Sequence, residues 1–188
     1  MTIKSEILEI ETDLGIGIYN ITPQIEQLLE ASGIKNGHAI VFSRHTTTAL
    51  AINENEERLL EDVKVHLRKL APESGKYLHN DLHLRDVPPD EPENAHSHLM
   101  AMMLSSSEVI PVLDGKLALG TWQSVLFFEL DGPRKRTVLV QISGEGTATS
   151  TSLVSCSLSS VPASSWASSP NCSATSPPSS TSAACPAG

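Results

Sequence analysis

The hydrophobic pattern of the chain consists mostly of short apolar or alternating runs separated by turn residues. Runs of this kind, rich in β-branched residues, predict β-strands. The dipeptide Asp114-Gly115 separates two of them and is typical of a tight β-hairpin turn. We therefore predict strands over residues 3–11, 15–20, 38–42, 43–52, 108–113, 116–119, 124–130 and 136–143.

Three other segments carry apolar residues at helical spacing. Thr22 as N-cap with Pro23 after it predicts a helix start, and Gly33 predicts its end. A second helix is predicted over residues 56–70, and a third from the N-cap Asn94 through about Leu104. Because strands outnumber helices, we predict an α+β fold with a mostly antiparallel sheet, sandwich-like or half-barrel-like, and about three helices. The expected core of the third helix is Leu99, Met102 and Met103.

Composition divides the chain near residue 146. Every charged residue and every histidine lies in residues 1–146, which we predict to be one domain. Residues 147–188 are rich in Ser, Thr, Ala and Pro and hold all three cysteines, Cys156, Cys172 and Cys185. This uncharged tail lacks the apolar periodicity of a folded segment, so we predict that it is disordered or arises from a frame-shift or mis-splicing.

The net charge of −9 belongs entirely to residues 1–146. An acidic protein of this kind does not fit general nucleic-acid binding, which needs lysines and arginines against phosphates. The first residues lack the apolar run of a signal peptide, and no apolar stretch is long enough for a membrane span. We therefore expect a cytoplasmic protein with neither nucleic acid nor membrane as a partner.

The residues that suggest chemistry are concentrated between Tyr77 and His98. Four of the seven histidines lie there, with carboxylates and prolines among them. Imidazole, carboxylate and amide groups together suit a divalent metal such as zinc, manganese or magnesium. The alternative is a polar loop whose histidines are incidental. His96 and His98 would point in different directions on a helix, so at most one of them would reach a site.

Other candidate ligand-binding residues lie outside this stretch. The hydroxyls of Thr46 and Thr47 beside His45 could bind an anion, or could simply suit an exposed strand. Arg134 and Arg136 could bind a phosphate, although a solvated turn cluster is the commoner case. Trp122 could stack on a ligand ring or belong to the core.

Several motifs together strongly resemble the YjbQ family, labelled secondary thiamine-phosphate synthase enzymes, over about residues 1–146. Their order along the chain makes the resemblance specific. The motifs are Arg44-His45-Thr46-Thr47-Thr48, Asn53-Glu54-Asn55, Tyr77-Leu78-His79, Asn94-Ala95-His96-Ser97-His98, Gly120-Thr121-Trp122-Gln123 and Asp131-Gly132-Pro133-Arg134.

The resemblance implies a homotrimer and a site formed by His45, His79 and His98, with Glu54 and Asn94 near them. His45, His79 and His98 would be metal ligands or catalytic groups with Glu54. A small phosphorylated metabolite would be the partner, and its binding residues would be Thr46, Thr47, Asn94, Trp122, Gln123, Arg134 and Arg136.

The activity that the resemblance implies is thiamine-phosphate synthesis, in which a hydroxymethylpyrimidine pyrophosphate is joined to a thiazole phosphate. A divalent metal or arginines would stabilise the leaving pyrophosphate. Two alternatives remain open: a non-catalytic binding protein for a phosphorylated metabolite or metal, and a metal-dependent phosphate-ester hydrolase.

Overall fold

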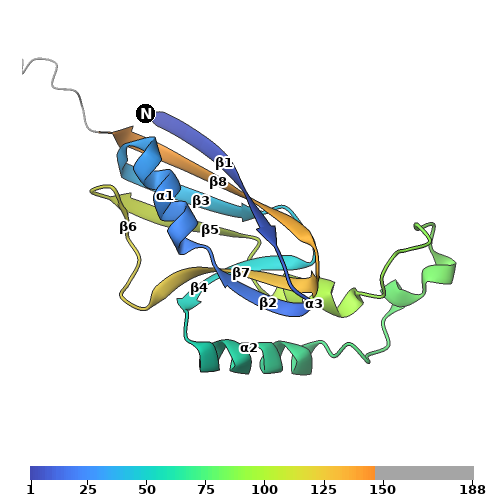
Figure 1. The fold of residues 1–188 in the computed structure, drawn as a ribbon. Helices are drawn as coiled ribbons and strands as arrows, with labels where there is room; N and C mark the ends of the chain where they lie inside the picture. Colours follow the sequence, from blue (N-terminus) through green and yellow to red (C-terminus); the bar gives the residue numbers. More distant parts are fainter. Residues whose placement is uncertain (147–188) are drawn as a thin grey trace, which may run out of the picture. The chain divides into compact units, whose positions relative to one another are not determined.

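The computed structural model describes residues 1–146, and the predicted tail lies outside the described residues. Two antiparallel β-sheets face each other, and three α-helices pack around them (Figure 1). The larger sheet has the strand order β1-β8-β3-β5-β6, and the smaller has the order β2-β7-β4. The predicted α+β fold with a mostly antiparallel sheet is confirmed.

The strands of the larger sheet, called sheet A, are β1 (Thr2–Glu11), β8 (Lys135–Gly146), β3 (Ile34–Ser43), β5 (Ser107–Leu113) and β6 (Lys116–Leu117). The strands of the smaller sheet, called sheet B, are β2 (Gly15–Asn20), β7 (Gln123–Gly132) and β4 (Thr48–Glu54). The helices are α1 (Thr22–Ser32), α2 (Glu57–Leu70) and α3 (Ala95–Met103), with short 3-10 turns η1 (Leu78–Asn80) and η2 (Leu82–Leu84).

Strand β7 is covered on both faces and connects two hydrophobic cores. Val125 and Phe127 pack into the core between sheets A and B, to which α1 also contributes. Leu126 and Phe128 face the second core, beneath α2 and α3. Burial on both faces explains why residues 125–128 are uninterruptedly apolar rather than alternating.

Helix α1 starts and ends close to the predicted residues, but its cap differs. Thr22 is the first helical residue rather than the N-cap, because its hydroxyl accepts a hydrogen bond from the Val125 N–H at 2.8 Å. The Thr22 N–H instead donates to Asn20 Oδ1 at 3.0 Å. Gly33 ends the helix with a left-handed φ of 69°, as predicted.

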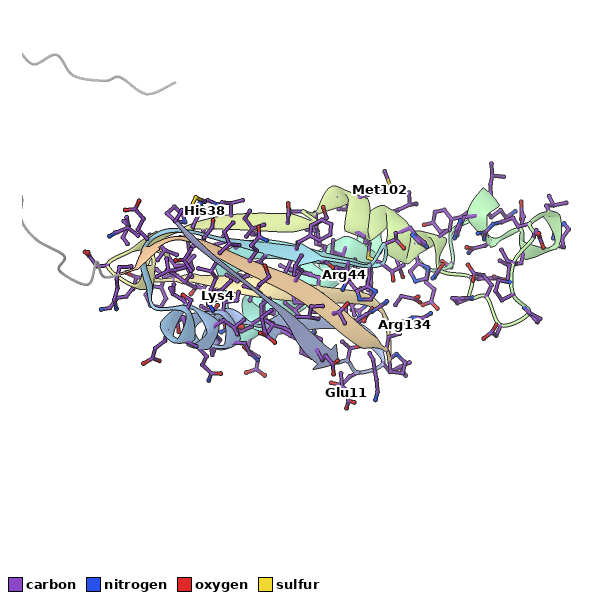
Figure 2. All side chains as sticks on the ribbon, turned by 90° about the horizontal axis from the view of Figure 1, so that it is seen from above. Lys4, Glu11, His38, Arg44, Met102 and Arg134 are labelled. Atoms are coloured by element: carbon purple, nitrogen blue, oxygen red, sulfur yellow. The ribbon has the colours of Figure 1, made fainter. Side chains whose placement is uncertain are left out.

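Helix α3 has the predicted length, but the prediction of its buried face was wrong. Leu99, Met102 and Met103 are exposed, and Figure 2 shows Met102 pointing away from the protein body. The helix packs with Ala95, Ser97 and Met100, and the Ser97 hydroxyl donates to the Leu130 carbonyl oxygen. Ser97 on the inner face bonds directly to β7, and Met100 beside it fills the core, which leaves Leu99, Met102 and Met103 outside.

Residues 72–94, which we call the arm, connect α2 to α3 and extend away from the two sheets (Figure 1). The arm contains η1 and η2, and its Leu78 and Leu84 side chains are largely exposed. No helix within residues 1–146 combines the length and apolar character needed to cross a membrane.

Candidate functional site

An open cleft of about 780 Å³ lies between the connection from β3 to β4 and helix α3. This connection crosses from sheet A to sheet B, so it lies at the edge of the central core. The lining includes the charged or imidazole side chains of Arg44, His45 and His98, hydroxyl groups such as that of Thr46, and the apolar residues Phe42 and Met102. The sequence-predicted residues His45, Thr46 and His98 therefore share one cleft.

The orientation of His45 is fixed by a backbone group. Strand β3 ends at Ser43, beside Val138, and therefore provides no carbonyl partner for the next N–H on β8. His45 replaces it: the Thr137 N–H donates to His45 Nε2 at 2.9 Å, and the Thr137 hydroxyl lies 3.2 Å from the same atom. Because an N–H can only donate, Nε2 is an acceptor, and the neutral imidazole carries its proton on Nδ1.

The electrostatic surroundings keep His45 neutral. Burial, and after it the nearby Arg136 guanidinium, lower the pKa of His45 below its ordinary value of 6.5. His45 is thus a neutral donor through Nδ1–H at neutral pH. Its Nε2 is already engaged by the backbone, so a metal ion would have to displace that hydrogen bond.

His79 and His98 lie against each other where the arm meets α3. Their ring centroids are 4.8 Å apart, and the rings are inclined by 67°. Burial, and then the neighbouring His79, lower the pKa of His98 below 6.5. The Nε2 atom of His79 is buried without a hydrogen-bond partner. An unsatisfied buried nitrogen costs free energy unless a ligand, water or ion completes it.

Two further residues fix the backbone around His79. Asn80 Oδ1 accepts a hydrogen bond from the Ala95 N–H, the first residue of α3, at 3.1 Å. Arg85 Nη1 donates to the His79 carbonyl oxygen at 2.7 Å. The arm is therefore held to α3 next to the histidine pair, although much of it is exposed.

Asn94 and Arg134 meet at Asp131 on β7. The Asn94 Nδ2 group donates to Asp131 Oδ2 at 2.8 Å, and Arg134 Nη2 lies 2.9 Å from the same oxygen. Asn94 Oδ1 is buried without a hydrogen-bond partner. Asn94 occupies the predicted N-cap position of α3, but its side chain makes no capping hydrogen bond and binds Asp131 instead.

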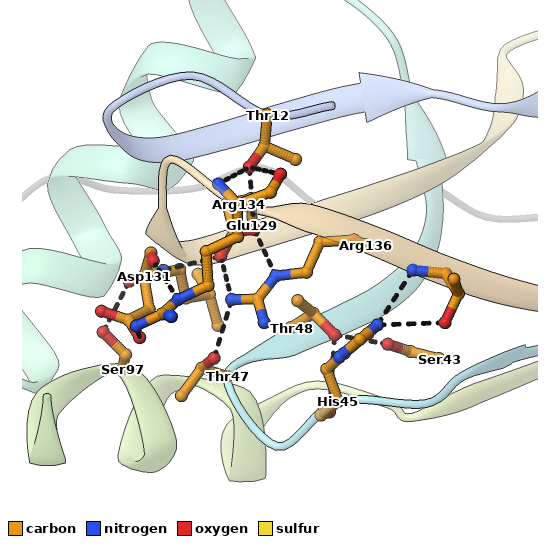
Figure 3. A network of polar contacts seen from close by, with 12 residues as sticks. Thr12, Ser43, His45, Thr47, Thr48, Ser97, Glu129, Asp131, Arg134 and Arg136 are labelled. Atoms are coloured by element: carbon orange, nitrogen blue, oxygen red, sulfur yellow. Dashed lines mark hydrogen bonds and ion pairs between the residues drawn. The ribbon is translucent and has the colours of Figure 1, made fainter. Parts of the chain in front are cut away.

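A buried ion pair underlies the cleft (Figure 3). Arg136 donates from Nε and Nη2 to the Glu129 carboxylate at 2.6 and 2.7 Å, and its Nη2 also reaches the Thr47 hydroxyl at 2.9 Å. Burial alone would raise the pKa of Glu129, but the hydrogen bonds from Arg136 and the Asp131 N–H outweigh it and lower the pKa. Arg136 and Thr47 thus support the cleft from below.

The predicted site residues Glu54, Trp122 and Gln123 do not line the cleft. Glu54 pairs with Gln123 at one end of the ladder between β4 and β7, whereas Thr48 pairs with Glu129 at the other end, beside the cleft. Trp122 is exposed. Within one chain, the structure therefore separates these three residues from the histidines.

The predicted metal set of three histidines is not assembled in one chain. Among residues 1–146, no three histidine, cysteine or carboxylate side chains are grouped closely enough to hold a metal ion. His79 and His98 are adjacent, but His45 is bound to Thr137. The metal role of these histidines stays a prediction.

Sequence reasoning missed the roles of Asn80 and Asp131. Asn80 directly follows His79, so the sequence places it next to a candidate site residue. Nothing in the sequence predicts that its partner lies fifteen residues later. Asp131 lies in a Gly-Pro turn and in one of the motifs that resemble the family, but neither assigned it a partner. Its contact with Asn94 joins residues 37 positions apart, so it could be recognised only from the folded structure.

The fold and the cleft describe a small α+β protein with two sheets and a candidate ligand site lined by histidines. The chain belongs to the family described as UPF0047 protein YjbQ-like, which matches residues 6–145. A UPF0047 protein from Methanothermobacter thermautotrophicus is 41% identical over 145 residues, covering 77% of this chain and 95% of that protein. The Bacillus subtilis UPF0047 protein YugU is 33% identical over 138 residues, covering 73% and 97% respectively.

Solved structures agree with this membership. A protein of unknown function from Sulfolobus solfataricus has 38% identity and a TM-score of 0.69, covering 77% of this chain and 99% of that chain. A hypothetical protein from Aeropyrum pernix has 38% identity and a TM-score of 0.69, covering 76% and 99%.

These comparisons correct the expected activity. The relatives are named only as UPF0047 or YjbQ-like proteins, and the Sulfolobus solfataricus structure is described as a protein of unknown function. Family membership therefore gives no thiamine-phosphate synthase activity to this chain, and the expectation of that activity was wrong.

Proposed function

We propose that this protein binds a divalent cation at His79 and His98 and uses it to hold a small phosphorylated metabolite in the adjoining cleft. The observation that carries the proposal is the buried, unpartnered Nε2 atom of His79 beside the His98 ring. Buried polar atoms are normally satisfied, and an ion is one of the few partners that could complete two imidazoles at once.

The protonation of His98 suits metal binding. An imidazole must be neutral to coordinate a cation, and burial together with His79 lowers the pKa of His98. Imidazole nitrogens favour zinc, and an added oxygen ligand makes manganese or magnesium possible. Asn94, one helical turn before His98, has a buried Oδ1 without a partner and could supply that oxygen. When bound, the cation would neutralise charge on a phosphate.

The anion would lie in the cleft that contains His98. Arg44 lines this cleft and forms no ion pair within residues 1–146. His45 offers its Nδ1–H as a neutral donor, and Thr46 offers a hydroxyl. Arg134 and Arg136 are already paired with Asp131 and Glu129. Arg44 is therefore the better candidate for a phosphate contact in this acidic protein.

Assembly as a homotrimer is part of the proposal. Ile7 and Phe42 lie on the outer face of sheet A, because both pair with Leu139 on β8. Val109 lies on the same face, because it pairs with Ile40, two residues before Phe42 on β3. All three side chains are exposed, as are Ile3 and Leu113. Phe42 also lines the cleft, so a neighbouring subunit on this face would border the open side of the site.

Metal analysis tests the cation site. We expect stoichiometric zinc or manganese in the purified 188-residue chain after incubation with either metal. His79→Ala and His98→Ala should each lower metal affinity at least about tenfold, because each removes one of the two imidazole ligands. The measurement is elemental analysis with a competitive chelator titration.

His66→Ala is the matched control, since His66 lies on the exposed side of α2. It should bind metal like the unchanged protein. No bound metal in the unchanged protein, or equal affinities in all four proteins, would overturn the proposed cation site.

A further inference from the structure

We propose that Asn80 is a positioning residue that holds the His79 imidazole in place against His98. The inference rests on the proposed cation site but concerns a residue that would not touch the cation. Asn80 directly follows His79, and its Oδ1 accepts the Ala95 N–H at 3.1 Å. The contact joins the residue after one histidine to the helix that carries the other.

Asn80 supplies the side-chain hydrogen bond that the N-cap residue of α3 does not make. The first N–H groups of a helix have no partner inside the helix and are usually satisfied by the N-cap side chain. In α3 the N-cap residue is Asn94, but its side chain makes no capping bond and donates to Asp131. The cap therefore comes from the arm, fifteen residues earlier in the chain.

This arrangement couples the position of His79 to the register of α3. Ala95 and His98 belong to the same first turn of α3, so fixing residue 80 at Ala95 also sets the distance between residue 79 and His98. Arg85 adds a second restraint, because its Nη1 donates to the His79 carbonyl oxygen at 2.7 Å. The same guanidinium lies 3.9 Å from Glu91, across the arm.

The restraint matters because the arm has little else to hold it. Leu78 is 88% exposed and Leu84 is 74% exposed, so the arm gains little from burial near the two histidines. No residue of η1 or η2 is fully buried. The hydrogen bonds of Asn80 and Arg85 therefore supply a restraint on His79 that apolar burial of the arm does not provide.

Two variants of the full chain test the role. Asn80→Ala removes the acceptor, and Asn80→Asp keeps one. Asn20→Ala is the matched control, because Asn20 Oδ1 accepts the N–H of Thr22 at the start of α1, far along the chain from the histidines. The first readout is cobalt(II) affinity by absorption titration. The second is the NOE between the His79 and His98 ring protons in metal-free protein.

We expect Asn80→Ala to weaken cobalt(II) binding about tenfold or more, as loss of an orienting partner does at metal sites. It should also remove the ring–ring NOE, whereas Asn80→Asp and Asn20→Ala should retain both. An unchanged NOE and affinity in Asn80→Ala would overturn the positioning role while leaving the cation site intact. A protein that binds no cobalt(II) but loses the NOE only in Asn80→Ala would refute the cation site and support the positioning role.

Discussion

At the scale of single residues, the Glu129–Arg136 pair places two opposite charges in the protein interior. Both side chains are almost fully buried, and the carboxylate also receives the Thr12 hydroxyl at 3.0 Å. A buried ion pair gains little over an apolar pair, but removing one partner leaves an uncompensated charge in the core. Its contribution therefore shows most clearly when only one partner is deleted.

We predict that Glu129→Ala lowers the free energy of unfolding by about 3–5 kcal/mol, because it leaves the Arg136 guanidinium buried without a counter-charge. Urea denaturation followed by circular dichroism measures this. Glu11→Ala removes the partner of an exposed pair, with Glu11 and Lys135 side chains 81% and 88% exposed, and should leave stability nearly unchanged. Equal effects of the two substitutions would contradict a structural role for the buried pair.

The lowered pKa of His98 also links stability to pH. In the unfolded chain the His98 imidazole binds a proton near pH 6.5. In the folded chain it does so only at lower pH, because His98 is buried beside His79. Between these values the unfolded state holds more protons, so stability is complete above about pH 6.5 and is lost as the pH falls towards the folded pKa.

We predict that His98→Asn makes metal-free stability less dependent on pH as the pH falls from 7 to below 6.5, because the differential proton uptake disappears. Urea midpoints at half-unit pH steps would measure the change. The unchanged protein should lose stability more steeply over this window. Identical slopes in the two proteins would show that His98 titrates alike in the folded and unfolded states.

At the scale of elements, local signals predicted most of the fold. The Asp114-Gly115 hairpin forms as expected, with φ values of 50° and 77° that suit a tight turn. Helix α3 shows the limit: Leu99 and Met102 looked like core residues, but Ser97 and Met100 face the sheet. A helix with apolar residues on several sides does not reveal which side is buried until its partner surface is known.

The candidate site was predictable as a set of residue types but not as a geometry. The sequence pointed to His79 and His98, which the fold brings together. It could not indicate that Thr137 would occupy Nε2 of His45, because that contact spans 92 residues. Nor could it indicate that Arg136 would be neutralised by Glu129, since an arginine's partner depends on which strands become neighbours.

At the scale of the whole molecule, the outer face of sheet A carries several exposed apolar side chains. The exposed side chains of Ile7, Phe42 and Val109 lie on three different strands of one sheet. Exposed apolar patches that extend over several elements commonly mark protein–protein interfaces. The face therefore provides the physical basis for the proposed trimer.

We predict that Val109→Asp shifts the protein from trimer towards monomer, because a charge on this face would be buried without a partner in an interface. Analytical ultracentrifugation measures the change. Val65→Asp is the control, since Val65 is an exposed valine on α2, at 44% compared with 60% for Val109. A monomeric unchanged protein, or no shift in Val109→Asp, would contradict the proposed assembly surface.

The strand order of sheet A also has a consequence for biosynthesis. Strand β8 lies between β1 and β3, although it is the last of the three to be made. A nascent chain on the ribosome therefore carries β1 and β3 without the strand that joins them until residues 135–146 leave the exit tunnel. Until then both strands have unpaired edges that could pair with another chain, so this sheet closes only at the end of domain synthesis.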